Sequence, residues 1–126
     1  MATILLVDGD ALQAYLRKTI LERRFSDVQR VADPAEALCL VEQPQFAGNL
    51  GLVISGHHAA GIGGPAFVAE LHERMPRLPV LVLGGPGEKA SDYAHSDACF
   101  LPRFTSTDEL LAVAGQMLAG QTRRSA

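Results

Sequence analysis

The sequence predicts an α/β fold in which helices cover a parallel β-sheet, and three observations lead to this fold class. Five short apolar runs have the composition of strands, and they are Thr3–Val7, Val28–Val31, Leu52–Ser55, Val80–Leu83 and Cys99–Leu101. Segments with helical periodicity separate these runs, and a strand–helix alternation of this kind is typical of parallel sheets. The third and fourth runs are almost uninterrupted apolar sequence, which indicates central strands buried on both faces.

The first helix is expected from about Asp10 to Arg23. Its larger apolar residues recur at the three-four spacing that gives one buried stripe. We therefore expect this stripe to face the sheet, and its members are Leu12, Tyr15, Leu16, Thr19 and Ile20.

Three of the remaining helices have clear start signals. Asp33 precedes Pro34 and Glu36, an arrangement that caps a helix, and Pro44 ends that segment. The next helix begins after Gly64. The last helix begins with a capping box of Ser106 and Glu109.

The segment 88–97 is the weakest of the predicted helices. It is polar and follows a run of glycine and proline. We expect a short, mobile helix there, because the segment has little apolar area to offset its ordering entropy.

Composition limits the classes of function. The 126 residues fit one domain, which we expect over 1–120, with a tail or the start of a linker over 121–126. The net charge of −3 gives no basic surface for nucleic acid. No apolar run approaches the roughly 20 residues that span a bilayer, and no signal peptide precedes the first strand, so we expect a cytoplasmic protein. Cys39 and Cys99 lack metal-ligand spacing and are expected to be small buried residues.

In open parallel sheets, ligands and chemistry lie just past the carboxyl ends of the strands. At these ends the sequence has Asp8-Gly9-Asp10, Gly56, Gly84 and Arg103. Two of the four ends therefore carry no side chain where a reactive one is expected.

In their order and spacing, four stretches resemble the response-regulator receiver domains of two-component signalling, over essentially the whole chain. They are 4–8, 52–55 followed by a glycine-rich loop at 61–64, 78–83 and 100–103. The resemblance implies a flavodoxin-like sandwich with strand order 2-1-3-4-5, two helices on one face and three on the other. It also implies that a histidine kinase supplies a phosphoryl group to an aspartate of the receiver. The modified aspartate then reshapes the face made by the fourth helix, the fifth strand and the fifth helix.

The sequence departs from the family at the residues that carry this chemistry. The acceptor aspartate corresponds to Gly56, which offers no nucleophile. The acidic pair that holds Mg²⁺ corresponds to Asp8 and Gly9, so one carboxylate of the pair is missing. The hydroxyl residue after the fourth strand corresponds to Gly84.

The two remaining family positions lie in and after the fifth strand. Arg103 stands in place of a lysine, and its planar guanidinium is not equivalent to a compact ammonium. Phe100 matches an aromatic residue that turns inward or outward with activation. We therefore interpret the chain as a degenerate receiver without catalytic residues, cofactor or metal. It is expected to bind a protein partner, or itself, through the fourth-helix, fifth-strand and fifth-helix face, independently of phosphorylation.

Several alternatives remain open. In the first, phosphorylation or a metal still switches the chain at a non-standard site near Asp8 and Asp10. This alternative requires Asp10 to join Asp8 as a ligand, whereas Asp10 fits a helix cap better. His57 and His58 flank the acceptor position but fit solvated loop residues better, and lone His72 and His95 carry even less signal. A flavin or nucleotide binder on the same fold is the least supported alternative.

Two positions also have a purely structural interpretation. In one interpretation, Arg103 forms an ion pair with Asp8 across the pocket. Such a pair contributes about 1 kcal/mol or less to stability. Phe100 either packs under the fifth helix, which we favour, or contacts a partner.

Overall fold

The computed structural model describes residues 2–56, 64–84, 90–93, 97–102 and 106–125. The strands are β1 (Thr3–Val7), β2 (Val28–Val31), β3 (Leu50–Ser55), β4 (Val80–Leu83) and β5 (Cys99–Leu101). The helices are α1 (Ala11–Leu21), α2 (Pro34–Val41), α3 (Pro44–Asn49), α4 (Gly64–Arg74), the 3₁₀ helix η1 (Ala90–Tyr93) and α5 (Thr107–Ser125).

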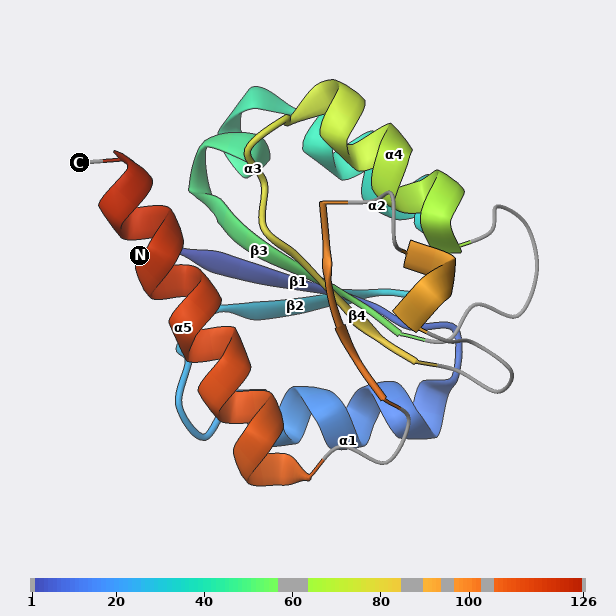
Figure 1. The fold of residues 1–126 in the computed structure, drawn as a ribbon, viewed down its shortest axis with the longest axis vertical. Coiled ribbons are helices and arrows are strands. Elements are labelled where there is room, and N and C mark those ends of the chain that lie inside the picture. Colours follow the sequence, from blue (N-terminus) through green and yellow to red (C-terminus); the bar gives the residue numbers. More distant parts are fainter. Residues whose placement is uncertain (1, 57–63, 85–89, 94–96, 103–105, 126) are drawn as a thin grey trace.

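The five strands form one parallel sheet in the order β2-β1-β3-β4-β5, which confirms the flavodoxin-like arrangement (Figure 1). Val7 at the end of β1 lies opposite Val31 of β2 and Ser55 of β3. Leu83 at the end of β4 lies opposite Leu101 of β5. The register therefore brings the carboxyl ends of the strands to one edge of the sheet.

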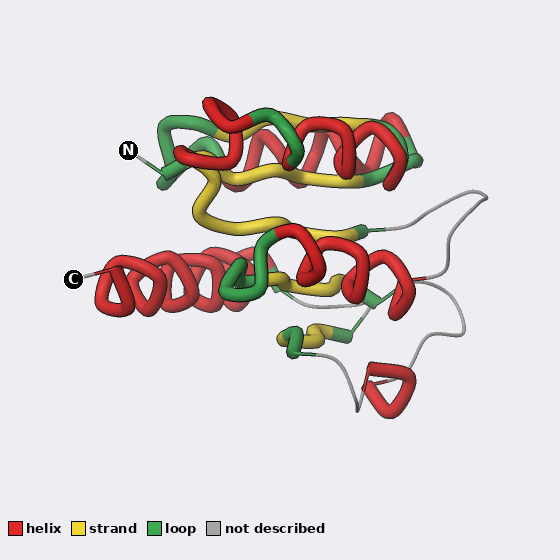
Figure 2. The backbone as a smooth tube through the Cα atoms, turned by 90° about the horizontal axis from the view of Figure 1, so that it is seen from above, coloured by secondary structure: helices red, strands yellow, loops and turns green. Residues whose placement is uncertain are grey.

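Helices cover both faces of the sheet, as Figure 2 shows from a second direction. Side chains alternate between the two faces along each strand, so the strands contribute to two separate cores. One core includes Leu5 and Val7 and packs against α2, α4 and Tyr93 of η1. The other core includes Ile4 and Leu6 and packs against α1 and α5.

Two of the predicted helix caps are confirmed. The Asp33 carboxylate accepts a hydrogen bond from the Glu36 amide at 2.8 Å, and Pro34 opens α2. The Ser106 hydroxyl accepts from the Glu109 amide at 3.1 Å.

Other element boundaries differ from the prediction. Pro44 ends α2 but also starts α3, because proline fits the first turn of a helix as well as it ends one. Strand β3 begins at Leu50, two residues earlier than predicted. Helix α5 continues through Ser125, so residues 121–125 are helical. The described part of the segment 88–97 contains only the single turn of η1.

The predicted inner stripe of α1 is wrong for most of its members, although Ile20 is partly buried and packs against the core shared with α5. Leu12, Tyr15 and Leu16 are 69%, 67% and 52% exposed, whereas Ala14 and Leu21 are buried against the sheet. Both sets satisfy helical spacing, and the sheet contacts the set with the smaller apolar area.

Two further expectations concern the cysteines and the membrane. Both cysteines are exposed, not buried as predicted, because Cys39 lies on the outer face of α2 and Cys99 lies on the edge strand β5. Among the residues that the structure describes, no helix combines the length and the apolar composition that crossing a membrane requires.

Candidate functional site at the carboxyl edge of the sheet

Backbone hydrogen bonds extend the sheet past its strands and fix the first residue after three of them. The Asp8 amide donates to the Val31 carbonyl at 3.1 Å, and the Gly56 amide donates to the Val7 carbonyl at 2.7 Å. The Gly84 amide donates to the Leu101 carbonyl at 2.8 Å. Three of the predicted site positions are therefore held in place by the sheet itself.

Asp8 is the only carboxylate among the buried polar residues of the described chain, and it is fully buried. Its Oδ1 accepts a hydrogen bond from the Asp10 amide at 2.9 Å. Its Oδ2 accepts from Nη1 of Arg17 at 2.9 Å, which makes an ion pair. Arg30 of β2 donates to the Asp8 backbone carbonyl from Nη2 at 2.7 Å and from Nε at 3.2 Å. The carboxylate thus has a donor on each oxygen, as a buried charge requires.

Arg17 comes from the second turn of α1, and its side chain is 13% exposed. Asp10 starts this helix, because its carboxylate accepts from the Gln13 amide at 2.9 Å. Burial lowers the pKa of the Arg17 guanidinium, and the nearby Asp8 carboxylate opposes that change. The guanidinium remains charged at neutral pH, because arginine keeps its proton over the whole physiological range.

The Asp8–Arg17 pair occupies the space beside Gly56. A Cβ atom at this glycine would lie 2.6 Å from Arg17 Nη1 and 2.8 Å from Asp8 Oδ2. Both distances are too short for real contacts, so any side chain at position 56 requires the pair to shift. Gly56 has no side chain, and the space that a side chain would need is taken by the Arg17 guanidinium and the Asp8 carboxylate.

The space beside Gly84 is filled in a different way. A Cβ atom there would lie 2.8 Å from Cζ of Phe100, at the tip of the ring. The Phe100 ring also packs on Tyr93, with 5.5 Å between ring centroids. Phe100 is half-buried and belongs with the core under α2 and α4, so the prediction that it packs under the fifth helix is wrong. The ring points toward the site rather than away from it.

The structure brings together some of the predicted site residues. Asp8, Gly56 and Gly84 lie at the same edge, and Asp10 is a helix cap, as the preferred interpretation has it. Arg103, His57, His58, His95 and loop residues 61–63 lie outside the described residues. His72 is the one described histidine, and its Nε2 lies 2.9 Å from the Leu78 carbonyl oxygen.

Arg17 is the site residue that the sequence pattern did not reveal. It lies on the stripe of Ala14 and Leu21, which are both buried. Long charged side chains are almost never buried unless they are paired. An arginine on the same helical stripe as two small or apolar residues was therefore the signal that could have predicted a buried, paired Arg17. It was hidden because the larger residues Leu12 and Leu16 suggested the opposite stripe.

The residues at this edge do not fit the Mg²⁺ ion that receiver chemistry implies. Mg²⁺ requires several oxygen ligands in octahedral geometry. Both Asp8 oxygens already accept N–H donors, one oxygen of Asp10 caps α1, and Gly9 and Gly56 have no side-chain oxygen. Within the described residues, no three His, Cys, Asp or Glu side chains are grouped to hold a metal ion.

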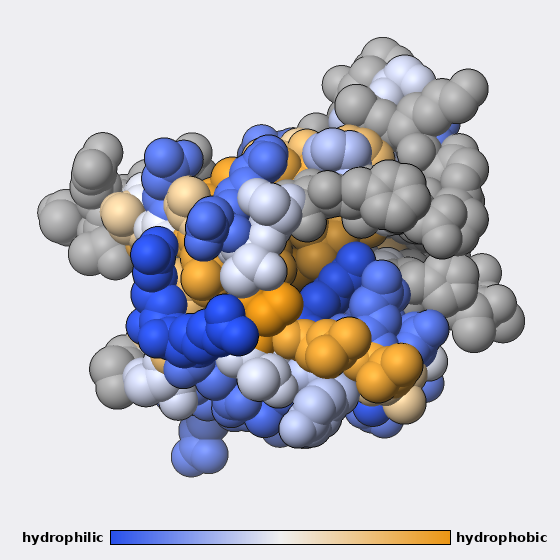
Figure 3. Space-filling view, turned by 90° about the horizontal axis from the view of Figure 1, so that it is seen from below, coloured by the Kyte–Doolittle hydropathy of each residue, from blue (hydrophilic) through white to orange (hydrophobic). Residues whose placement is uncertain are grey.

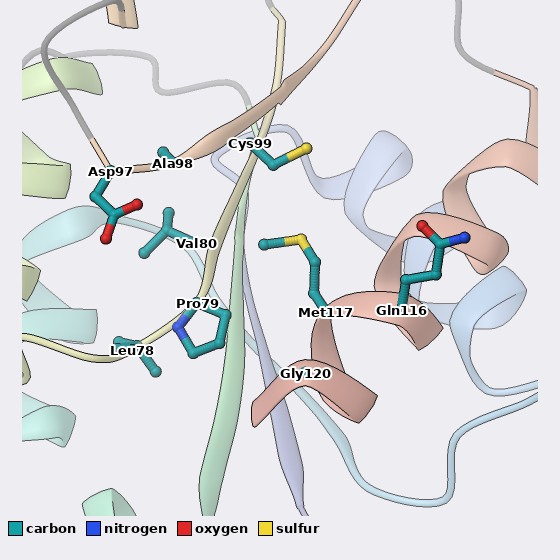
Figure 4. Close-up of a pocket in the computed structure, with 9 residues that line it drawn as sticks. All are labelled: Leu78, Pro79, Val80, Asp97, Ala98, Cys99, Gln116, Met117 and Gly120. Atoms are coloured by element: carbon teal, nitrogen blue, oxygen red, sulfur yellow. The ribbon is translucent and has the colours of Figure 1, made fainter. Parts of the chain in front are cut away.

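A hollow of about 400 Å³ lies at the opposite, amino end of strands β4 and β5. It is lined by Leu78, Pro79, Val80, Asp97, Ala98, Cys99, Gln116, Met117 and Gly120. Figure 4 shows Leu78, Pro79 and Val80 on one side of this hollow and Gln116 and Met117 of α5 on the other. Polar and apolar atoms contribute almost equally to the surface of its lining.

Comparisons with known proteins show similarity in structure. A response regulator receiver protein from Sinorhizobium medicae WSM419 has a TM-score of 0.80 and 20% identity, with 95% of this chain and 96% of that chain covered. A signal receiver domain of an HD domain-containing protein from Pseudomonas fluorescens Pf-5 has a TM-score of 0.83 and 24% identity, covering 98% and 91%. The receiver domain of the hybrid histidine kinase CckA has a TM-score of 0.75 and 26% identity, covering 93% and 99%. No family model and no curated protein matches the sequence.

Proposed function

Because this chain has the fold of response-regulator receiver domains, we propose that it is a receiver-like signalling domain that works without phosphorylation. It acts as a non-catalytic module that binds another protein or a second copy of itself. The single observation that carries this proposal is the Arg17–Asp8 ion pair, which fills the space beside Gly56.

The first support is chemical. Forming an acyl phosphate needs a free carboxylate oxygen as nucleophile. Position 56 has none, and both oxygens of Asp8 accept hydrogen bonds in a fully buried position. For Asp8 to act as a substitute acceptor, the Arg17 side chain would have to move away. The Asp8 carboxylate would then be buried without its cation. Breaking a buried pair in this way costs about 3–5 kcal/mol.

The second support is the coupling between the site and the surface. In the receiver family, a hydroxyl after the fourth strand connects the phosphoryl group to the surface of the domain. Gly84 has no hydroxyl, and the Phe100 ring covers the position instead. The aromatic ring is therefore held by packing against Tyr93 and Gly84, with no dependence on a phosphoryl group.

The proposed partner surface is formed by η1, β5 and α5. The hollow between β5 and α5 lies on this surface, and Cys99 is exposed beside it. Within the part of the chain that the structure describes, strand β5 is also the edge of the sheet, with one side not paired to another strand. Such an edge suits a protein partner.

The proposal is tested by incubating the chain with Mg²⁺ and acetyl phosphate, followed by intact-protein mass spectrometry. A receiver domain that carries an aspartate after its third strand is treated in parallel to show that the phosphodonor is active. We expect a phosphoryl adduct on that domain and an unchanged mass for this chain. A stoichiometric, base-labile gain of one phosphoryl group on this chain would overturn the proposal.

A metal titration tests the alternative of a switch near Asp8 and Asp10. Amide chemical shifts of residues 8–10 are followed by NMR while Mg²⁺ is added. We expect no saturable change, since the carboxylates already have hydrogen-bond donors. A saturable shift centred on these residues would instead favour a metal-dependent receiver.

A further inference from the structure

The Arg17–Asp8 pair differs from the other ion pairs of the described chain in its burial. The Asp8 side chain is fully buried and the Arg17 side chain is 13% exposed, whereas every side chain in the other three pairs is at least 28% exposed. A second carboxylate, that of Asp10, lies two turns before Arg17 and therefore on the same side of α1. Burial lowers the pKa of the Arg17 guanidinium most, and the charges of Asp8 and Asp10 both oppose this change.

Helix α1 turns this guanidinium toward the sheet and turns apolar side chains toward solvent. Leu12 and Leu16 are exposed, and Figure 3 views the molecule from the side of α1, where apolar side chains reach the surface. Charged side chains are usually outside and leucines inside, so the arrangement of this helix is the reverse of the usual one. A nearly buried guanidinium needs a partner of opposite charge, and Asp8 supplies it.

The guanidinium lies at the place where the two families of evidence about this edge disagree. The resemblance to receivers implies a divalent cation beside the position of Asp8, whereas the residues present do not fit one. Nη1 of Arg17 lies 2.9 Å from Asp8 Oδ2 and 2.6 Å from the point where a Cβ atom on Gly56 would stand. A cation is needed there in either case, because a buried carboxylate without one is unfavourable.

We propose that the Arg17 guanidinium is an internal replacement for the divalent cation at this edge of the sheet. The positive charge beside Asp8 is then part of the chain, and the edge does not respond to metal ions. This inference deepens the proposed function and rests on it in one respect, the lack of receiver chemistry at position 56. It assigns to Arg17 a role that the resemblance gives to a metal.

The proposal predicts that removing the guanidinium opens a site for a cation. Asp8 Oδ2 loses its donor, and Asp10 uses one of its two oxygens as the cap of α1. Carboxylate oxygens suit Mg²⁺ and Mn²⁺. Two carboxylates are fewer ligands than such an ion prefers, so binding should be weak, with a dissociation constant of about 1 mM.

Urea unfolding of the full chain and of Arg17→Ser, with and without about 20 mM Mn²⁺ at constant ionic strength, tests the proposal. Serine is too short to reach Asp8 and leaves room for a hydrated ion. We expect no change for the natural sequence and a midpoint raised by about 1 M urea for R17S. The proposal is overturned if R17S gains no stability or if the natural sequence gains as much.

The same titration covers the case in which R17S does not fold alone. Far-UV circular dichroism then replaces urea unfolding, and Mn²⁺ should induce folding because the bound ion supplies the missing charge. A chain that stays unfolded at about 20 mM Mn²⁺ counts against the proposal as firmly as a folded chain that does not respond.

Two control variants show whether the response belongs to Asp8. D8N/R17S removes the carboxylate together with the guanidinium and should not respond to Mn²⁺. Arg74→Ser is the matched surface control, because Arg74 also contacts two carboxylates, those of Glu42 and Glu70, at 3.1 Å each. These carboxylates remain hydrated, so we expect no shift of the midpoint. A response of either control equal to that of R17S would overturn the proposal.

Paramagnetic broadening by Mn²⁺ locates the ion in R17S. We expect the amide NMR signals of residues 8–10 to broaden first, and the same signals of the natural sequence to stay sharp. Broadening that begins elsewhere in R17S would place the ion at another site and contradict the proposal.

Failure of this proposal is distinguishable from failure of the proposed function. The response of R17S to Mn²⁺ concerns the cation beside Asp8, whereas the acetyl phosphate experiment concerns a phosphoryl adduct on the natural sequence. An R17S chain that ignores Mn²⁺ overturns the role of Arg17 and leaves an unchanged mass with acetyl phosphate fully valid.

Discussion

Gly56 and Gly84 end adjacent central strands, and different kinds of side chain fill the space beside them. At Gly56 the filling group is a charged pair, Arg17 with the fully buried Asp8. At Gly84 it is the tip of the Phe100 ring, which also packs on Tyr93. Neither glycine has a side chain, but the groups that fill the two spaces differ. The Asp8 carboxylate depends strongly on the Arg17 guanidinium, whereas the Phe100 ring depends less on Tyr93.

The difference comes from the cost of leaving each group alone. A buried carboxylate without its cation is far less stable than an apolar ring that has lost one contact. We therefore expect substitutions near Gly56 to depend strongly on one another in their effect on stability. Substitutions near Gly84 should be better tolerated. The following predictions test this contrast, from the largest expected effect to the smallest.

Arg17→Met should have the largest effect. It leaves Asp8 buried and without its cation, which should lower the free energy of unfolding by about 3–5 kcal/mol. Urea unfolding measures this change. The double variant D8N/R17M removes both charges and should recover more than half of the loss. A double variant as unstable as R17M would show that packing of the arginine stem, not charge, dominates.

Gly56→Ala should cost about 1–3 kcal/mol, because its Cβ pushes Arg17 away from Asp8 and weakens a hydrogen bond to a buried charge. Thermal unfolding measures the change. In an R17M background the same substitution should cost less, since the nearer of the two obstructing groups is gone and only the Asp8 carboxylate remains. Additive effects of the two changes would contradict the coupling.

Gly84→Thr should cost about 1–3 kcal/mol through overpacking against the Phe100 ring. The matched variant G84T/F100L shortens the ring side chain and should restore most of this stability in urea unfolding. If F100L does not restore the stability of G84T, the backbone at position 84 is the obstacle. The Phe100 ring would then not be the group that limits the space beside Gly84.

Asp10→Ala should have the smallest effect, a loss of about 1 kcal/mol from the missing helix cap. Asp10→Asn keeps a capping oxygen and should change stability by less than about 0.5 kcal/mol. Urea unfolding of the two variants separates the cap from any role of the charge. A large effect of the asparagine variant would point to charge at this position as the important property.

The strands and the sheet order could be predicted because their signals are local and repeated. The apolar runs of β3 and β4 are typical of buried central strands, and their register follows from the parallel alternation. The caps at Asp33 and Ser106 were predictable for the same reason, since a cap depends on residues within one turn.

The side of α1 that faces the sheet could not be predicted in the same way. Two stripes on this helix satisfy the spacing, and apolar size favours the wrong one. Periodicity does not encode the contacts that accompany the choice, such as the pairing of Arg17 with Asp8, nine residues earlier in the chain. The positions at the strand ends were therefore predictable, whereas the group that fills the space between them was not.

The Arg17–Asp8 pair also has a consequence for sequence change at position 56. An aspartate introduced there would lie beside the Arg17 guanidinium and would compete with Asp8 for that cation. The carboxylate that loses this competition stays buried without its cation, which is unfavourable. An acceptor aspartate at this position therefore requires further substitutions around it as well.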